Sequence, residues 1–386
     1  MIIFNEKFFD ECVKLNRGFD LPNNKIKQGI YPIVASTNIK AYHKIFKVKG
    51  PGVVTGRSGS LGVVQYISDD FWPLNTSLYV KDFKGNDPKY IFYLLSTMQL
   101  ENFNSGSSVP TLNQNHLHKQ KIKIPNLFFQ QRIVSILSSY DELIETNNQR
   151  IKLLEETARE LYKEWFVRMR FPGYQQVKFE KGIPKSWKFK DLKQLGKIYT
   201  GKTPSTKIKE YYGGNIPFIK TPDLHKNQFI YETQEYLTEK GNSTQKRSTL
   251  PKGAICVSCI GTGGIVGITT AEKSQTNQQI NSIIPSDNSN TEFLFYAISD
   301  LKETIELFGY TGATMTNLSK GKFEKLKILY PSLEMIKNYH KIVNPIFEMI
   351  QIIQQQNTQL KEIRDRLLPR LISGKLQLKM QQEAKQ

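Results

Sequence analysis

The chain has 386 residues, more than one hydrophobic core usually organises, so two or more domains are expected. Its 54 lysines and arginines exceed its 35 aspartates and glutamates, and the net charge of +19 favours a polyanionic partner, nucleic acid before an anionic membrane surface. With only three cysteines there is no disulfide framework, which favours a reducing, cytoplasmic location.

We expect neither a targeting segment nor a membrane span. Near the N-terminus the charged residues Glu6, Lys7 and Asp10 interrupt the apolar run that a signal peptide needs. The longest weakly polar run, residues 253–268, is rich in glycine and shorter than the roughly 20 residues of a spanning helix.

Residues 1–125 are predicted to form a globular α+β domain. Short β-branched runs such as residues 62–67 are separated by Gly, Asn, Ser and Pro, which is typical of strands joined by turns. A short helix is expected near residues 90–98. Residues 126–172 then form a long helix, the central spacer helix.

This long helix carries an apolar seam in alternating steps of four and three residues, the pattern of a coiled coil. The seam consists of Ile133, Leu137, Tyr140, Ile144, Asn147, Ile151, Leu154, Ala158, Leu161 and Trp165. The same spacing recurs in a distal spacer helix, residues 332–375, at Tyr339, Val343, Ile346, Ile350, Ile353, Asn357, Leu360, Arg364, Leu367 and Leu371. The chain therefore contains an internal repeat.

Between the two helices, residues 173–331 repeat the first domain as a second α+β domain. The matched pairs are Gly18 with Gly201, residues 31–34 with 216–219, 59–62 with 261–264, Asn75 with Asn277, residues 106–112 with 312–318, and 122–125 with 328–331. The second copy carries extra residues, mostly between Asp223 and Gly253. The two copies thus share a frame and differ in their loops.

We predict that the helices pair as an antiparallel intramolecular coiled coil. Each seam contains one asparagine, and Asn147 facing Asn357 would fix the register, because a buried amide costs free energy unless it is hydrogen-bonded. In that register every seam position has a seam partner, although Tyr140 opposite Arg364 is a weaker layer. Residues 376–386 form a C-terminal tail near the N-terminus, which gives a pseudo-two-fold, circular arrangement.

One motif indicates nucleotide binding but lacks the required context. Residues 196–203 fit the pattern G-x-x-x-x-G-K-T, in which the lysine and threonine open a helix that holds phosphate. Here Pro204 follows and no amphipathic helix is predicted. A P-loop enzyme is therefore the weakest alternative.

No metal site or catalytic set is predicted. Cys256 and Cys259 have the spacing of a zinc or redox pair, but the sequence has no second pair, and Cys259 corresponds to Arg57 in the first copy. His116 and His118 are expected to be loop or surface residues rather than ligands.

The residue types that remain suit DNA binding. The loop of residues 56–62 combines glycines, which permit close backbone approach, with an arginine that can bind guanine or phosphate, and residues 259–264 keep the glycines. The candidate DNA-binding residues are Arg57, Ser58, Ser60 and Asn75 in the first domain and Lys202, Thr203, Ser205, Lys220, Thr262, Asn277 and Gln278 in the second. At each position, turn formation explains the residue type at least as well.

Several motifs resemble the DNA-specificity subunit of type I restriction-modification systems. The opening of the second domain resembles the family's recurrent domain opening in residues 183–187, 201–205, 212–219 and 223–224. The start of the first helix, Gln130-Gln131-Arg132-Ile133, is similar to the family's helix entry. Residues 367–374 resemble the family's C-terminal signature. The first domain departs from the pattern with Phe19-Asp20-Leu21-Pro22, and the second helix with Asn338-Tyr339.

The resemblance implies two target-recognition domains, each reading one half of a bipartite DNA site, with the paired helices setting the spacer. It also implies a non-catalytic chain without a cofactor. S-adenosylmethionine, ATP and Mg would be bound by two modification (methyltransferase) subunits and by restriction (translocase and endonuclease) subunits. A basic coiled-coil scaffold without sequence-specific DNA binding is the other alternative.

The helix register is tested by cross-linking. If the two amides face each other, Asn147→Cys combined with Asn357→Cys should form a disulfide on oxidation, seen as a shift on a non-reducing gel. A control cysteine pair displaced by one seam step should remain reduced. Cross-linking of the control pair in place of the first would reject the register.

Overall fold

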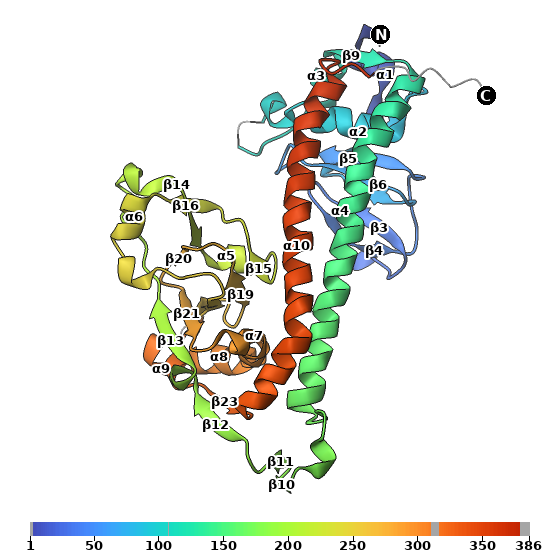
Figure 1. Cartoon of the computed structure of the whole chain (residues 1–386). Coiled ribbons are helices and arrows are strands. Elements are labelled where there is room, and N and C mark those ends of the chain that lie inside the picture. The colour runs from blue at the N-terminus through green and yellow to red at the C-terminus, as the bar shows by residue number, and fades with distance from the viewer. Residues whose placement is uncertain (1–2, 107, 310–315, 379–386) are drawn as a thin grey trace, which may run out of the picture. The chain divides into compact units, whose positions relative to one another are not determined.

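The computed structural model describes residues 3–106, 108–309 and 316–378 of the chain. It contains two compact units, residues Met1–Thr146 with Asn357–Gln386 and residues Asn147–Gln356. Each unit combines one α+β domain with one part of each long helix, as Figure 1 shows. The predicted α+β class is confirmed in both units.

In the first unit, an antiparallel four-stranded sheet has the order β2-β8-β5-β6. Its strands are β2 (Lys14–Arg17), β5 (Gly52–Gly56), β6 (Val64–Ile67) and β8 (Ser77–Asp82). A second sheet has the order β4-β3-β7, with β3 (Tyr31–Val34), β4 (Ile39–His43) and β7 (Trp72–Pro73), and β3 runs parallel to β7. A separate antiparallel pair joins β1 (Phe4–Phe8) to β9 (Lys121–Pro125).

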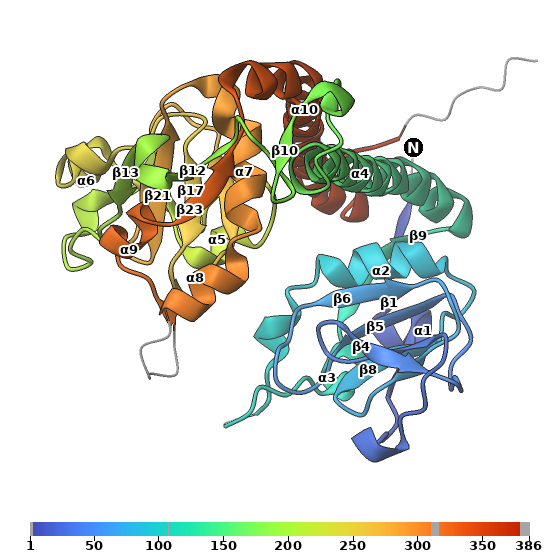
Figure 2. The same cartoon turned by 90° about the horizontal axis from the view of Figure 1, so that it is seen from below.

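Helix α2 (Pro88–Ser96) covers one face of the four-stranded sheet, beside β5 and β6 (Figure 2). It begins where the sequence favours a helix start, since Pro88 stands at the first helical position and the Asp87 carboxylate accepts the N–H groups of Lys89 and Tyr90, each at 2.9 Å. Its inner side buries Tyr90, Ile91 and further apolar residues. The other helices of this domain are α1 (Phe9–Cys12), α3 (Gln114–His118) and the 3-10 turns η1 (Asn23–Lys25) and η2 (Leu100–Phe103).

The domain of the second unit repeats this topology. Its larger sheet has the order β13-β21-β17-β19-β15, and its smaller sheet the order β16-β14-β20. The strands are β13 (Gly196–Thr200), β14 (Tyr212–Ile219), β15 (Phe229–Ile230), β16 (Glu235–Leu237), β17 (Ile255–Ser258), β19 (Val266–Thr269), β20 (Gln275–Thr276) and β21 (Ile280–Pro285). The pair of β12 (Lys188–Asp191) and β23 (Lys327–Tyr330) corresponds to β1 and β9. Each of these strands of the first domain has a counterpart in the second, so the predicted repeat is present.

The second domain has further elements, and some of them have no counterpart among the described residues of the first domain. Helix α5 (Thr221–Leu224), strand β15 and helix α6 (Glu239–Ser243) fall where the sequence predicts an insertion. The remaining elements are α7 (Thr291–Ser299), α8 (Lys302–Gly309), α9 (Lys320–Glu324), the pairs β10 (Phe179–Glu180) with β11 (Ile183–Pro184) and β18 (Ile260–Gly261) with β22 (Thr316–Asn317), and the 3-10 turns η4 (Tyr174–Gln176), η5 (Leu192–Gln194), η6 (Lys209–Tyr211), η7 (Lys246–Ser248) and η8 (Asn288–Asn290).

The long helices are α4 (Leu127–Tyr162), continued by one π turn at η3 (Lys163–Val167), and α10 (Leu333–Ile372). Within each unit they run antiparallel, as predicted (Figure 1). In the second unit the Tyr339 ring lies 5.7 Å from that of Trp165, and its hydroxyl donates to the Ala158 carbonyl at 3.3 Å. If Asn147 faces Asn357 in an antiparallel pair, the residue opposite Tyr339 is Trp165, so this contact agrees with the predicted register.

The asparagines of both seams are buried, with exposed fractions of 2% for Asn147 and 5% for Asn357. They belong to different units. Their facing therefore stays a prediction for the cross-linking experiment.

The Arg364 layer in the first unit contains an ion pair that the sequence did not predict. The guanidinium donates to the carboxylate of Asp141, the residue after Tyr140, at 2.7 Å. The same carboxylate accepts a hydrogen bond from the Tyr93 hydroxyl at 2.5 Å. Burial and this hydrogen bond to Asp141 raise the pKa of Tyr93. A half-buried guanidinium needs an anionic acceptor, which a tyrosine ring cannot supply.

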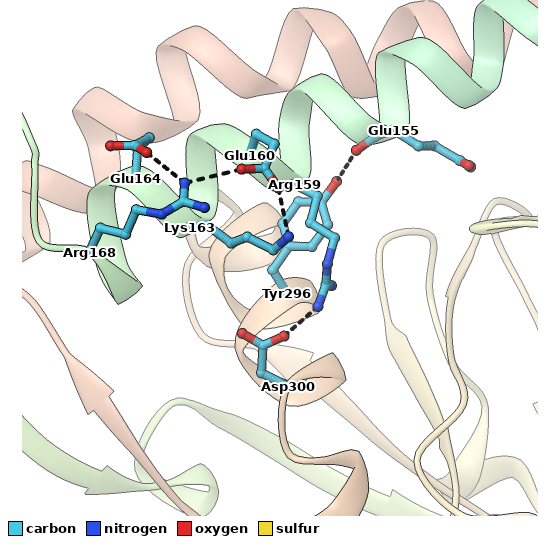
Figure 3. A network of polar contacts seen from close by, with 8 residues as sticks. All are labelled: Glu155, Arg159, Glu160, Lys163, Glu164, Arg168, Tyr296 and Asp300. Atoms are coloured by element: carbon cyan, nitrogen blue, oxygen red, sulfur yellow. Dashed lines mark hydrogen bonds and ion pairs between the residues drawn. The ribbon is translucent and has the colours of Figure 1, made fainter.

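In the second unit, polar side chains fasten α4 to α7 (Figure 3). Arg159 pairs with Asp300 at 2.6 Å and lies 5.9 Å from the centre of the Tyr296 ring, whose hydroxyl donates to the Glu155 carbonyl at 3.5 Å. Arg168 also bridges Glu160 at 3.1 Å and Glu164 at 2.5 Å. Because these last pairs are exposed, they contribute little to stability, and the buried aromatic contacts hold the domain to the helix.

After α10, the described part of the C-terminal segment lies against the first domain. Leu376 and Leu378 pack on its core, and the Leu376 N–H donates to the Arg370 carbonyl at 2.9 Å. Gly374 adopts φ +73° beside the Phe4 ring, a position that suits glycine. Residues 379–386 of the predicted tail lie outside the described residues, as does Gly312 of the predicted match to Gly106.

His118 differs from the expected surface position, because it is buried at the end of α3. Its Nε2 accepts the Leu15 N–H at 3.1 Å and therefore carries no proton. Burial, together with the charge of Lys14, lowers the pKa of His118 against an opposing effect of Asp10. His116 is exposed, as expected.

The helices of residues 3–106, 108–309 and 316–378 include none with the length and hydrophobicity of a membrane span.

His118 should make the stability of the protein depend on pH. Since its folded-state pKa lies below its usual value of 6.5, the unfolded chain binds this proton more readily, so stability is lost as the pH falls below about 6.5. In His118→Gln, an acceptor remains but does not titrate. The drop in melting temperature between pH 7.5 and 5.5 should therefore be smaller in this variant.

The matched control is His116→Gln, which should show the same drop as the unmodified protein. Equal pH dependence in all three proteins would contradict the role of His118.

Candidate nucleic-acid interface

Three segments meet at one end of the sheets in each domain. In the first domain these are the loop after β2, the loop after β5 and the turn after β7. In the second domain they are the loop after β13, the loop after β17 and the turn after β20. Backbone hydrogen bonds join the three segments in each domain. The Gly18 N–H donates to the Ser77 carbonyl at 3.0 Å, and the Gly201 N–H to the Ile280 carbonyl at 3.3 Å. Gly18 and Gly201, which the sequence matched, therefore occupy the same position in the two domains and make the same backbone hydrogen bond.

Both glycines are required by close backbone approach. A Cβ on Gly18 would lie 2.2 Å from the Leu74 carbonyl oxygen, and one on Gly201 would lie 2.1 Å from that of Thr276. No larger residue fits without moving the backbone.

The loop after β5 is fixed in the same way as the loop after β17. The Arg57 N–H donates to the Thr76 carbonyl at 2.8 Å, and the Cys259 N–H to the Gln279 carbonyl at 2.8 Å. The carbonyl of Arg57 accepts the Leu112 N–H at 2.8 Å, and that of Cys259 accepts the Leu318 N–H at 2.9 Å. The predicted equivalence of Arg57 and Cys259 holds in both bonds.

In the first domain, Arg57 and Asn75 come together. The Arg57 guanidinium donates through Nη1 to the Asn75 main-chain carbonyl at 3.3 Å, and the Asn75 side chain donates through Nδ2 to the Asp20 carboxylate. Ser58 is half-buried and Ser60 is exposed. Together they form a polar edge around Arg57.

In the second domain, Thr203 and Gln278 come together. The Thr203 hydroxyl donates to Gln278 Oε1 at 2.7 Å. Lys202, Ser205 and Thr262 are exposed. Lys220 is half-buried, paired with Glu235 at 2.5 Å and 5.5 Å from the centre of the Phe218 ring, so it is less available to a ligand.

Asn277 has a different place from the one expected for a base contact. Only 7% of it is exposed, its Nδ2 donates to Gln279 Oε1 at 3.0 Å, and its Oδ1 accepts the Gln279 N–H at 3.1 Å. The side chain thus shapes the turn that exposes Gln278.

The backbone also corrects the sequence match at this turn by one residue. The Leu74 N–H donates to the Val34 carbonyl at 2.9 Å, and the Asn277 N–H donates to the Ile219 carbonyl at 3.2 Å. Asn277 is therefore the counterpart of Leu74, and Gln278 is the counterpart of Asn75. The amides of Asn75 and Asn277 looked alike in the sequence, and that likeness concealed the shift.

The sequence did not identify Asp20, Ser36 or Thr221 as part of this end of the domains. The Ser36 hydroxyl donates to the Thr76 carbonyl at 2.8 Å, and the Thr221 hydroxyl donates to Gln279 Oε1 at 3.3 Å. One signal was present, because Asp20 and Thr203 each stand two residues after a matched glycine.

The chemistry of a metal or nucleotide site is not supported here. Burial raises the pKa of Cys256 to about 12 and that of Cys259 to about 11, so both thiols stay protonated at neutral pH. In the described part of the chain no group of three or more His, Cys, Asp or Glu is placed to hold a metal ion. Residues 196–200 of the P-loop pattern form strand β13 rather than a phosphate-binding loop.

Comparison with known proteins gives the family of the chain. The model of the type I restriction modification DNA specificity domain matches residues 4–156 and 184–362. The HindI specificity subunit of Haemophilus influenzae is 31% identical over 356 residues, covering 75% of this chain and 77% of that protein. The MjaIX specificity subunit of Methanocaldococcus jannaschii is 26% identical over 398 residues, covering 94% and 91%.

A solved structure supports the fold. The S subunit from M. genitalium superposes with a TM-score of 0.63 at 18% identity and covers 96% of both chains. The two matched regions coincide with the two repeated halves described above. The chain therefore belongs to the family of type I restriction-modification DNA-specificity subunits, which are non-catalytic.

Proposed function

We propose that this chain reads an asymmetric, bipartite DNA sequence, one half with each domain, and that the helix pair sets the spacer between the halves. The observation that carries the proposal is the repeated end of the two domains, where the same backbone hydrogen bonds support different side chains. Arg57 in one domain stands where the buried Cys259 stands in the other. A constant frame with different polar groups is suited to reading two different half-sites.

The charge of the chain supplies the affinity that does not depend on sequence. A net charge of +19 favours contacts with phosphate, which position a protein on DNA without specifying bases. Binding should therefore weaken steeply with salt. Binding of similar strength to matched and scrambled duplexes would favour the rival proposal of a basic scaffold.

Two modification subunits are the proposed partners on the helices. In the second unit, α10 carries Ile342, Met349 and Ile352 outside the seam, exposed by 46%, 44% and 52%. Their spacing of seven and three residues forms a second apolar stripe that suits a partner helix. S-adenosylmethionine, ATP and Mg would be bound by the modification and restriction subunits.

The cytoplasm is the proposed place of action. Cys12, Cys256 and Cys259 are all free and buried, a state that a reducing compartment preserves.

Arg57→Ala should alter one half-site only. Loss of an arginine contact to guanine or phosphate should relax the preference at one base by roughly tenfold, which corresponds to about 1.4 kcal/mol. Sequencing of methylated sites in a host that expresses the complex measures this. Lys202→Ala, in the other domain, should leave the Arg57 half-site unchanged, and identical motifs in both variants would contradict the assignment.

Removing seven residues from α4 should shorten the spacer while both half-sites stay the same. Seven residues keep the seam in register and remove about 10 Å of helix, or about three base pairs. A two-residue deletion is the control, because it turns the seam by about 200° away from its partner and should abolish methylation. An unchanged spacer in an active seven-residue variant would reject this role of the helices.

A further inference from the structure

One pair of side chains recurs at the same place in both domains. Asp20 and Thr203 each stand two residues after a matched glycine, and Asn75 and Gln278 are matched by the backbone hydrogen bonds of their turns. In both domains the two side chains are bonded to each other, Asn75 to Asp20 and Thr203 to Gln278. The chemical identities differ, while the bond across the two segments is kept.

Hydrogen-bond chemistry decides which end of each amide stays available. A carboxylate only accepts, so Asp20 holds the Asn75 NH₂ group and leaves Asn75 Oδ1 free of this contact. In the second domain the Thr203 hydroxyl donates to Gln278 Oε1, which leaves the Gln278 NH₂ group. Within the described residues, Asn75 Oδ1 has no donor and Gln278 Nε2 has no acceptor.

The surroundings of these atoms are open to a ligand. Gln278 is exposed and Asn75 is half-buried, at the end of each domain where the glycine-rich loops meet. The free atom is therefore an acceptor in the first domain and a donor group in the second.

We propose that Asn75 and Gln278 read one base each, with opposite hydrogen-bonding polarity, and that Asp20 and Thr203 are the positioning residues that set this polarity. This inference rests on the proposed function. Asn75 Oδ1 accepts from the amino group of adenine or cytosine, and Gln278 Nε2 donates to guanine O6 or thymine O4.

Arg57 sharpens the assignment in the first domain. Its Nη1 donates to the Asn75 main-chain carbonyl at 3.3 Å, so the guanidinium is anchored at the residue that carries the free side-chain oxygen. A donor next to an acceptor matches adenine, which offers N7 as acceptor and N6 as donor. The second domain has the buried Cys259 at that position and lacks the additional donor.

Thr203→Asp tests the rule in the second domain. Aspartate cannot donate at neutral pH, so the Gln278 amide must turn its NH₂ group inward and present Oε1 to DNA. The preference at one base of that half-site should switch from guanine or thymine to adenine or cytosine, by roughly tenfold in relative methylation. The readout is sequencing of methylated sites produced by the complex with its co-expressed modification subunit.

Thr203→Val is the matched control for this change. Valine has the size of threonine but makes no hydrogen bond, so the Gln278 amide is free to turn either way. The preference at the same base should broaden rather than switch. The first half-site is an internal reference in both variants and should stay unchanged.

The first domain provides an independent test. Asp20→Ala should broaden the preference at one base of the first half-site, because Asn75 is no longer held in one orientation. Combining Asp20→Asn with Asn75→Asp should restore it, since the new amide donates to the new carboxylate, and a carboxylate at position 75 still only accepts. A purely structural role of the pair would not predict this recovery of base preference.

The outcomes separate the inference from the function on which it rests. Motifs unchanged in Thr203→Asp and Asp20→Ala, with both half-sites still methylated, would overturn the polarity rule and leave the proposed function intact. No sequence-specific methylation by the unmodified complex would reject the proposed function itself. If Thr203→Asp loses all methylation, the two first-domain variants decide the rule.

Discussion

Burial of the helix seams is the constraint on which both units depend. In the second unit, Ile151 and Ala158 of α4 and Trp165 of η3 belong to the same core cluster as Tyr339 and Val343 of α10. That cluster continues into the domain through Phe293 and Ile255, among others. In the first unit, Ile133, Leu137 and Leu371 likewise share one core with the sheet and with α2. Each large apolar side chain buried this way contributes about 1.5–3 kcal/mol, so the helices and domains are stable only together.

This sharing of cores explains how the sequence is divided between constant and variable positions. Residues that pack on the helices repeat in type between the copies, as Phe92-Tyr93 and Phe295-Tyr296 do on α2 and α7. Backbone bonds at the far loops repeat as well, through Gly18 and Gly201. The exposed side chains at those loops are under no packing constraint, and there the copies diverge. Substitutions at these exposed positions should therefore leave the fold intact.

Repetition of a hydrogen bond between different residues carries more information than repetition of a residue. Asn75 and Asn277 share a residue type, yet Asn75 is half-buried at its turn and Asn277 is buried within its own. Asp20–Asn75 and Thr203–Gln278 share no residue type and occupy the same place. The insertion of α5, β15 and α6 adds further surface to the second domain alone, which increases the asymmetry of the pair.

The sequence alone determined the repeat, the α+β class, the long helices and the family resemblance, because apolar periodicity and recurring motifs are local properties of the chain. It also located two of the segments that meet at the end of each domain, the glycine-rich loops of residues 56–62 and 259–264 and the loops that carry the matched Gly18 and Gly201. Only the tertiary structure decided which polar groups meet there. Asp20 and Asn75 are distant in sequence, as are Arg364 and Asp141, and their pairing depends on how strands and helices pack. The one-residue shift at Gln278 and the burial of His118 were decided in the same way, because a hydrogen bond to a distant backbone group leaves no periodic trace in the sequence.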